Sequence, residues 1–324
     1  MLNGFTLRLA LIFLALLPSG LLAGFFIASF RHRLGRDLVT LALGLGVISA
    51  FVAIAAELGL QYLLSLTPAG ASTLWSSFRE ASVIAAVPEE SIKFLLLTTI
   101  IRRHEDCDSG GDLFCAAVLI GLGFAAVENL LYLIDSGSHW LSIGLARSTL
   151  AVPGHAIFGI MMGHGLAMAW RRAVDPAERY KWQVLALLCP VVAHTLYDFP
   201  LMAINAVGQP TAGLLNNPLL YLQLGVLVLA AVIAWFVARQ ELVRIYTTRQ
   251  DLDQPTRRAL LPWRLVGGLM ILGALGCIGF AAWMMAHGKP LGLLLALPSI
   301  YPLAFGCIMQ MRPPKASLAA VAQA

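Results

Sequence analysis

The chain has 324 residues, of which 59% are hydrophobic and only 12% are Asp, Glu, Lys or Arg, about half the charged share of a soluble domain. With a mean hydropathy of +0.80, this composition excludes a soluble enzyme and indicates a polytopic membrane protein. The net charge of +5 fits a topology signal, and no basic tract interleaved with aromatic residues points to nucleic acid. The five scattered cysteines predict neither a disulfide framework nor a thiolate metal cluster.

Repeated apolar runs divide the chain into segments of about 20 residues or more, each long enough to cross a hydrocarbon core of roughly 30 Å as a helix. The first run lacks a clear cleavage site, so we expect a retained anchor and not a signal peptide. We predict an all-α, polytopic transmembrane helical bundle. Its nine predicted spans are residues 7–30, 38–65, 81–101, 113–134, 141–170, 182–206, 219–238, 265–286 and 291–309.

The basic residues predict how these spans are oriented. Seventeen of the 22 lie in the tail and in the loops that follow spans one, three, five and seven, two lie in the opposite loops, and three lie within spans. Loops rich in Lys and Arg stay in the cytoplasm. We therefore expect the N-terminus outside and the C-terminus in the cytoplasm, with the segment 239–264 as a cytoplasmic loop.

Ionisable side chains gather in spans two to six, although each costs roughly 2.5–3.5 kcal/mol at the centre of a membrane helix. Spans seven to nine contain essentially none. When residues are counted from the expected outer end of each span, most of these groups lie at a similar depth in the outer half of the membrane. His164 lies nearer the cytoplasm. The group comprises Glu57, Glu89, Glu90, Lys93, Glu128, Arg147, His155, His164, His194 and Asp198.

The segment VPEESIKFLLL places two adjacent carboxylates after Pro88, which loosens a helix. Lys93 follows Glu89 by four positions and Glu90 by three, so all three side chains share one helix face. One carboxylate can pair with the ammonium, which leaves the other as a base or a metal ligand. The alternative is a plain ion-paired contact between helices.

The segment HTLYDF places His194 and Asp198 four positions apart, a spacing that suits metal ligation or proton transfer, with the Tyr197 hydroxyl nearby. The alternative is a histidine that holds two helices together by a hydrogen bond. Two further segments carry weaker signals when taken alone. In GFAAVENLLYL, Glu128 follows Phe124 by four positions, and in RSTLAVPGHAIFG, Arg147 and His155 flank Pro153.

Taken in order, these patterns resemble the PrsW family of membrane-embedded proteases, relatives of the CAAX-processing and bacteriocin-processing proteases. That family has EExxK, FxxxE, a histidine in a following helix and HxxxD. This chain has EESIK at 89–93, FAAVE at 124–128, His155, and HTLYD at 194–198. The resemblance covers about residues 80–206. It implies one membrane domain (1–324) with a catalytic core at about 80–206 and accessory spans at 1–65 and 219–309.

Carried over by residue, the resemblance implies a catalytic core of Glu89, Glu90, His155 and His194 that Glu128 and Asp198 support. Lys93, Arg147 and Phe124 are further supporting residues. The mechanism is either metal-dependent or a glutamate that activates water. The candidate metal ligands are Glu90, His155, His194 and Glu128, and imidazole with carboxylate suits Zn²⁺.

Charge balance leads to the same open choice. Five acids within the spans face only two permanent cations, so protons, protonated histidines or a divalent ion must compensate.

We expect an intramembrane protease of a bacterial cytoplasmic membrane, acting on membrane-anchored protein substrates near the extracytoplasmic face. The family resemblance suggests an anti-sigma factor as one substrate. The rivals are a proton- or cation-coupled transporter, which predicts polar groups reaching both faces, and a non-catalytic membrane scaffold.

Overall fold

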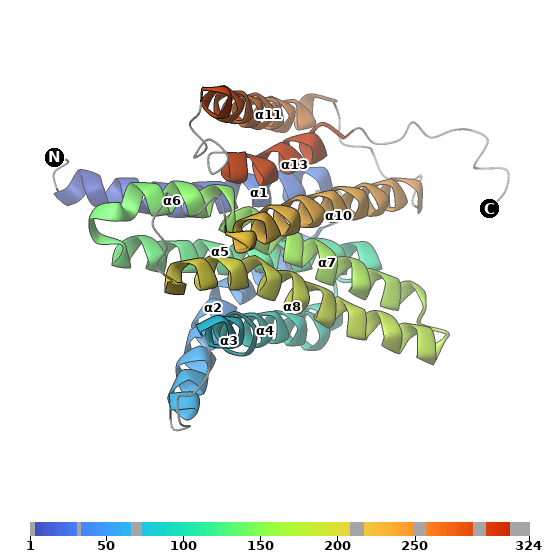
Figure 1. Cartoon of the computed structure of the whole chain (residues 1–324). Coiled ribbons are helices and arrows are strands. Elements are labelled where there is room, and N and C mark those ends of the chain that lie inside the picture. Colours follow the sequence, from blue (N-terminus) through green and yellow to red (C-terminus); the bar gives the residue numbers. More distant parts are fainter. Residues whose placement is uncertain are drawn as a thin grey trace.

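A computed structural model describes residues 4–30, 34–65, 73–207, 217–248, 257–287 and 296–311. These residues form helices joined by short turns, with no strand among them, which confirms the predicted all-α class (Figure 1). The long elements are α1 (Gly4–Phe30), α2 (Arg36–Ser65), α5 (Gly110–Asp135), α7 (Ala151–Arg171), α8 (Pro176–Val207), α10 (Pro218–Thr248) and α11 (Arg257–Ala286). The shorter elements are α3 (Thr73–Arg79), η1 (Glu80–Ala86), α4 (Val87–Thr99), η2 (Ile101–Arg103), η3 (Gly137–His139), α6 (Trp140–Thr149), η4 (Leu297–Ser299) and α13 (Ile300–Met309).

Seven helical segments of the described chain are long and apolar enough to cross a membrane, so the protein is a multi-pass integral membrane protein. The third predicted span corresponds to α3, η1 and α4, which follow one another without a break from Thr73 to Thr99. Of the ninth predicted span, residues 291–295 lie outside the described part. Its described helix α13 has 10 residues, or about 15 Å, half of a hydrocarbon core.

Several helix boundaries differ from the prediction, and two of the differences affect the site or its surroundings. The fifth span, predicted as one helix, consists of α6 and α7, which meet at Leu150 (φ −119°, ψ −58°). The seventh span was predicted to end at residue 238, but α10 continues to Thr248. The first ten residues of the predicted cytoplasmic loop 239–264 are therefore helical, residues 249–256 lie outside the described part, and α11 begins at Arg257. Hydropathy falls after residue 238, but helical geometry does not require apolar side chains.

The central helix is α5, which packs against α1, α2 and α7. Close approach of α5 to α7 depends on glycine: a Cβ on Gly159 would lie 2.8 Å from the Ala117 carbonyl oxygen, and one on Gly163 would lie 2.8 Å from that of Phe114. Gly159 and Gly163 are four positions apart, a spacing of small residues that lets helix backbones approach closely. Gly20 and Gly24 have the same spacing, but only Gly24 is closely packed, against Trp263, whereas a Cβ on Gly20 would meet nothing within 4 Å.

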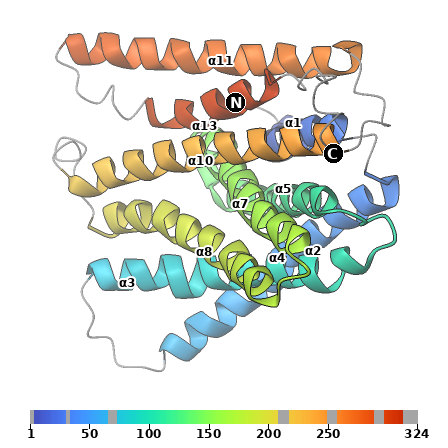
Figure 2. The ribbon, with the colours of Figure 1, turned by 90° about the vertical axis from the view of Figure 1, so that its right-hand side faces the viewer.

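The helices form layers on both sides of α5 and α7. Figure 1 shows α11 and α13 at one side of the bundle and the α3/α4 stretch toward the other, with α10 and α8 between them. Figure 2, a quarter turn away, shows α8 and α10 running side by side and α7 crossing them at an angle. This arrangement brings α4, α5, α7 and α8 together around the polar side chains described next.

Candidate active site

The two adjacent glutamates lie on the first turn of α4, immediately after an unusual stretch of helix. Residues Glu80–Ala86 form the π-helix η1, and the backbone N–H of Val87 donates to the Ser82 carbonyl, five residues back. Pro88 has no N–H to donate and its ring crowds the preceding turn, so the wider turn accommodates it. The predicted loosening before Pro88 is therefore a π-helix, a feature that often occurs at functional sites.

Lys93 lies at the centre of the site, and only 3% of its surface is exposed. Its Nζ lies 2.8 Å from Glu90 Oε1 and 3.3 Å from Glu89 Oε2, as the helical spacing predicts. It also lies 3.4 Å from His155 Nδ1 and 3.8 Å from the centre of the Phe124 ring. One ammonium thus joins α4 to α5 and α7.

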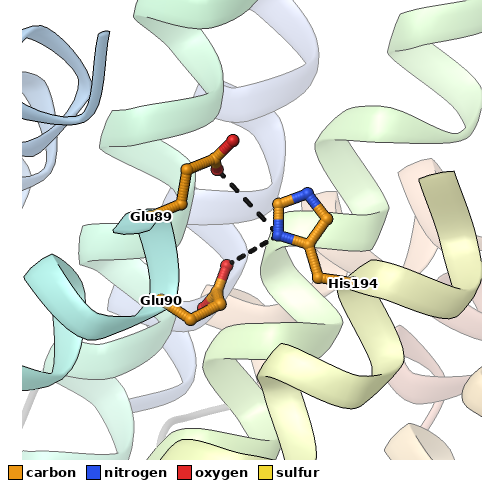
Figure 3. A group of neighbouring side chains, drawn as sticks. All are labelled: Glu89, Glu90 and His194. Carbon is orange, nitrogen blue, oxygen red and sulfur yellow. Dashed lines mark hydrogen bonds and ion pairs between the residues drawn. The ribbon is translucent and has the colours of Figure 1, made fainter. Parts of the chain in front are cut away.

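His194 lies between carboxylates on two helices. Its Nδ1 is 3.1 Å from Glu90 Oε1 and 4.0 Å from Glu89 Oε2, and Figure 3 shows both carboxylates turned toward the same ring nitrogen. Its Nε2 is 3.2 Å from Asp198 Oδ2, one turn along α8. The predicted HxxxD pair is therefore formed, and it connects α8 to the glutamates of α4.

His155 continues the network toward α5 and α6. Its Nε2 lies 2.7 Å from Glu128 Oε2, and the same oxygen lies 2.7 Å from a terminal nitrogen of Arg147. Because an ammonium can only donate hydrogen bonds, the contact with Lys93 assigns Nδ1 of His155 as an acceptor. We therefore place the ring proton on Nε2, where it is donated to Glu128.

Every residue predicted for the site belongs to this network, which crosses α4, α5, α6, α7 and α8. The residues are Glu89, Glu90, Lys93, Phe124, Glu128, Arg147, His155, His194 and Asp198. Most of their side chains are buried, and the more exposed ones lie at one edge, with Glu128 at 21%, Asp198 at 20% and Arg147 at 16%. Glu57 on α2 is half-buried and lies within electrostatic range of Glu128 and His194.

Several neighbours of the site were not predicted. Asn129 is completely buried, and its Oδ1 accepts a hydrogen bond of 2.8 Å from Arg147 Nε. The ring of Phe158 stacks on His194 at 4.7 Å between centroids, and Tyr132 lies beneath the Arg147 guanidinium at 3.8 Å. A polar residue next to Glu128 inside a span was the available signal for Asn129, whereas the aromatic contacts depend on tertiary packing.

His164 lies outside this network, as its predicted depth suggested. Its Nδ1 contacts Glu241 Oε1 at 2.7 Å. Glu241 is completely buried on the part of α10 that was predicted to be a loop. The prediction that the last three spans contain essentially no ionisable groups therefore missed Glu241, because the seventh span was ended three residues too early.

The cysteines and the acidic turn at 104–112 have no visible place in the site. All five cysteines are free. Burial raises the pKa of the Cys107 thiol to about 12, so at neutral pH this side chain is a protonated thiol.

Comparison with known proteins shows the family of the chain. The model of the PrsW family of intramembrane metalloproteases matches residues 35–238. The chain belongs to the PrsW family. Curated relatives named Protease PrsW include those of Bacillus subtilis (strain 168), 34% identical over 146 residues, and of Halalkalibacterium halodurans, 36% identical over 119 residues. A third, from Clostridioides difficile (strain 630), is 27% identical over 200 residues. No solved structure matches the chain.

These matches cover only part of each protein. The chain spans 63% of the length of the Bacillus subtilis relative and 53% of the Halalkalibacterium halodurans relative, using 45% and 37% of its own length. The Clostridioides difficile match uses 60% of this chain and 81% of the relative. The PrsW family match includes the whole polar network and extends beyond the predicted resemblance at 80–206 to take in α2 and much of α10.

The description of the family as metalloproteases can be tested against the residues present. Among the described residues, Glu89, Glu90 and His194 offer ligand atoms that all lie within 4.8 Å of one another. Glu90 Oε2 is buried without a hydrogen-bond partner, and such an oxygen is costly unless a proton or cation satisfies it. Two carboxylates and an imidazole suit Zn²⁺, so the residues fit a metal ion of unspecified identity.

The predicted ligand set is only partly the same. The predicted ligands Glu90 and His194 belong to the triad of Glu89, Glu90 and His194. The third member is Glu89, whereas His155 and Glu128 were predicted. His155 and Glu128 are paired with each other at 2.7 Å. Ligation by these two residues stays a prediction.

Proposed function

We propose that the protein is an intramembrane endopeptidase that hydrolyses peptide bonds of membrane-anchored protein substrates. The observation that carries this proposal is the continuous polar network of α4 to α8, buried between apolar helices. Four carboxylates, those of Glu89, Glu90, Glu128 and Asp198, share it with two permanent cations. Such a group is expensive in a membrane and is best explained by chemistry.

Glu89 is the proposed general base. Its Oε2 lies 3.3 Å from Lys93 and 4.0 Å from His194, contacts that are looser than those of its neighbour. Glu90 accepts from Lys93 at 2.8 Å and from His194 at 3.1 Å, which suits a positioning residue. Glu89 is therefore the carboxylate better able to take a proton from an attacking water.

In a metal-dependent version, Glu89 would be a ligand instead of the base: a metal ion bound by Glu89, Glu90 and His194 would polarise the scissile carbonyl and acidify water. Asp198 would then hold the His194 ring through Nε2, the supporting contact that metal-binding histidines usually have. Lys93 contacts both glutamates and limits the negative charge that the triad presents. In the metal-free alternative, the same residues orient water for Glu89.

The more exposed edge formed by Glu128, Asp198 and Arg147 is the proposed entrance for water and substrate. A substrate helix hides its amides in intrahelical hydrogen bonds, and unwinding it in lipid leaves each amide unsatisfied. Cleavage therefore requires a wet site. Because the basic loops predict that this layer is nearer the outer face, we propose cleavage in the extracytoplasmic juxtamembrane segment or outer third of a single-span substrate. An anti-sigma factor is one candidate.

Co-expression with tagged single-span proteins tests this activity. We expect wild type to release fragments whose ends, mapped by mass spectrometry, lie in the outer third of the substrate span. Glu89→Gln should reduce cleavage by a factor of about 10²–10⁴, the usual contribution of a general base. Glu80→Gln is the matched control, since Glu80 lies on the same helical stretch and contacts Gln61 outside the network.

The outcomes separate the parts of the proposal. Cuts on the cytoplasmic side would contradict the orientation. Cuts that persist in Glu89→Gln but vanish in Glu90→Gln would exchange the two roles. Cuts that persist in both variants and in His194→Ala would remove the site altogether.

Metal analysis of the purified protein tests the triad without requiring a substrate. We expect near-stoichiometric metal in wild type and loss of most of it in Glu90→Gln and His194→Ala, because two ligands cannot replace three. Glu241→Gln is the control, since it changes a buried glutamate outside the triad. Full activity in strong chelator, with little metal in wild type, would leave only the version in which Glu89 activates water.

A further inference from the structure

A second buried charge cluster, formed by His164, Arg171, Glu241 and Arg244, connects the C-terminal parts of α7 and α10. Glu241 is completely buried. Its carboxylate contacts His164 Nδ1 at 2.7 Å, Arg171 at 2.8 and 3.1 Å, and Arg244 at 3.0 Å. The cluster is nine positions along α7 from His155, and an apolar stretch of that helix separates the two.

Among the described residues, this cluster has more positive than negative charge. The single carboxylate of Glu241 faces the two guanidiniums of Arg171 and Arg244, and Arg244 also donates to Met168 Sδ at 3.5 Å. About a third of the Arg171 side chain and 41% of the Arg244 side chain are exposed, while Glu241 is inaccessible. An approaching ion therefore meets the two arginines and not the acid, which favours an anion.

An apolar groove of about 420 Å³ begins at this cluster. His164, which contacts Glu241, also lines the groove. The ring of Trp182 packs edge-on against the His164 ring. The groove follows α8 as far as Leu196, with α7 and α10 as its other walls. Fourteen residues of helix span about 21 Å, more than half the hydrocarbon thickness of roughly 30 Å. The helices α8 and α10 pack against each other and are neighbours in Figures 1 and 2.

We propose that this groove binds an anionic phospholipid, with an acyl chain between α8 and α10 and the headgroup phosphate at Arg171 and Arg244. Bidentate guanidinium contacts suit phosphate, and basic pockets between membrane helices on the cytoplasmic side bind anionic headgroups. A tryptophan at the mouth matches the depth at which aromatic residues lie in membranes.

Charge distinguishes a lipid from a substrate helix as the occupant. The cytoplasmic flank of a single-span substrate is enriched in Lys and Arg. The mouth of this groove is itself positive and lies at the end where the basic loops are predicted. A basic substrate flank would be repelled there, whereas an anionic headgroup is attracted.

Native mass spectrometry of delipidated protein, titrated with phosphatidylglycerol or phosphatidylcholine of the same chains, tests the site. We expect wild type to prefer phosphatidylglycerol and Arg171→Gln/Arg244→Gln to bind it about 30-fold more weakly, since each basic residue near the headgroup layer contributes to the attraction. Arg103→Gln/Arg172→Gln is the matched control. It removes the same charge from exposed positions at the same end of the molecule and should retain binding.

Three further variants keep the test decisive if removal of the arginines weakens the fold. Arg171→Gln/Arg244→Gln/Glu241→Gln leaves no buried unpaired carboxylate and should bind as weakly as the double variant. Cys189→Trp keeps the arginines but fills the groove that this residue lines, and it should also lose the lipid. Glu241→Gln alone raises the positive charge and should bind phosphatidylglycerol at least as tightly as wild type.

Several results would overturn the proposal. Equal binding of the two lipids to wild type would show a non-specific annular lipid. Equal binding of phosphatidylglycerol to wild type and to Arg171→Gln/Arg244→Gln would remove the headgroup site. Displacement of the lipid by inorganic phosphate at the same concentration would assign the arginines to free phosphate instead of a lipid. A photo-crosslinker at position 189 that captures a substrate span and no lipid would assign the groove to substrate.

Discussion

The position of Lys93 explains how two adjacent glutamates can be buried together. Its ammonium contacts both carboxylates and lies over the Phe124 ring, so charge, hydrogen bonds and a ring quadrupole all favour the cation. Each glutamate alone would be costly at this depth. The lysine is therefore as necessary to the site as the acids are.

A first prediction follows for Lys93→Met, which removes the cation but keeps much of the side-chain volume. We expect a loss of about 3–5 kcal/mol of stability, the usual cost of breaking a buried ion pair by removing one partner. Thermal inactivation of the purified protein in detergent is the measurement. The loss should appear even when no substrate is present.

The double variant Lys93→Met/Glu89→Gln provides the control for this prediction. Removing both partners leaves fewer uncompensated charges, so stability should recover in part. If the double variant is less stable than either single variant, the two residues do not stabilise each other, and the pairing at 3.3 Å has no energetic role.

At the scale of elements, the site depends on how closely α5 approaches α7. A Cβ on Gly121 would lie 2.6 Å from the His155 carbonyl oxygen. Close packing of this kind positions Glu128 on α5 against His155 on α7. A side chain at position 121 must move one helix relative to the other, because cores do not deform freely.

The second prediction is that Gly121→Val reduces proteolysis at least tenfold, because misplacing a positioning contact by about 1 Å can cost 10²-fold. Cleavage of a co-expressed substrate and thermal inactivation should both be measured. Gly44→Ala is the control, since a Cβ there meets nothing within 4 Å and should leave both properties unchanged. Wild-type cleavage in Gly121→Val would mean that the α5–α7 spacing tolerates change.

Contacts within one helix were the most predictable part of the site. The spacing of Glu89, Glu90 and Lys93, and that of His194 and Asp198, determines these contacts through helical periodicity alone. Contacts between helices, such as Glu90 with His194 and Glu128 with His155, followed only from the expectation that the groups share one depth. That expectation could not indicate which atoms pair.

Other features could not be predicted because they depend on tertiary packing. The π-helix before Pro88 replaces a turn that the sequence suggests only as a weak point. The break at Leu150 is different, because Pro153 lies three residues later and gives a local signal for it: proline cannot donate to the carbonyl four residues back, and its ring crowds that turn. Glu241 was missed because a fall in hydropathy was taken as the end of a helix, although its contacts with α7 bury it completely.

At the scale of the whole molecule, the two charge clusters lie toward opposite ends of the bundle. His155 is near the start of α7 and His164 is nearer its end, and the partner of each is on a different helix. The proposed division into a core at 80–206 and accessory spans assigns the first cluster entirely to the core. The second cluster joins that proposed core to α10, so in this proposal the accessory helix α10 holds the end of α7 that is predicted to be cytoplasmic, and the core carries the chemistry.

The last prediction concerns topology, on which the position of cleavage depends. Seven helical segments of the described chain can cross the membrane, and α3, η1 and α4 together supply an eighth helical stretch. Basic residues predict that the turn between α7 and α8 and the segment after α10 are cytoplasmic. A cysteine tag at position 213 should therefore react with a membrane-impermeant reagent in intact cells, whereas a tag at 250 should react only after lysis; both positions lie outside the described residues. The reverse pattern would place the polar network nearer the cytoplasm and the arginine cluster outside. The predicted site of cleavage and the lipid proposal would then both fail, whereas labelling of both tags from one side would mean that α10 does not cross.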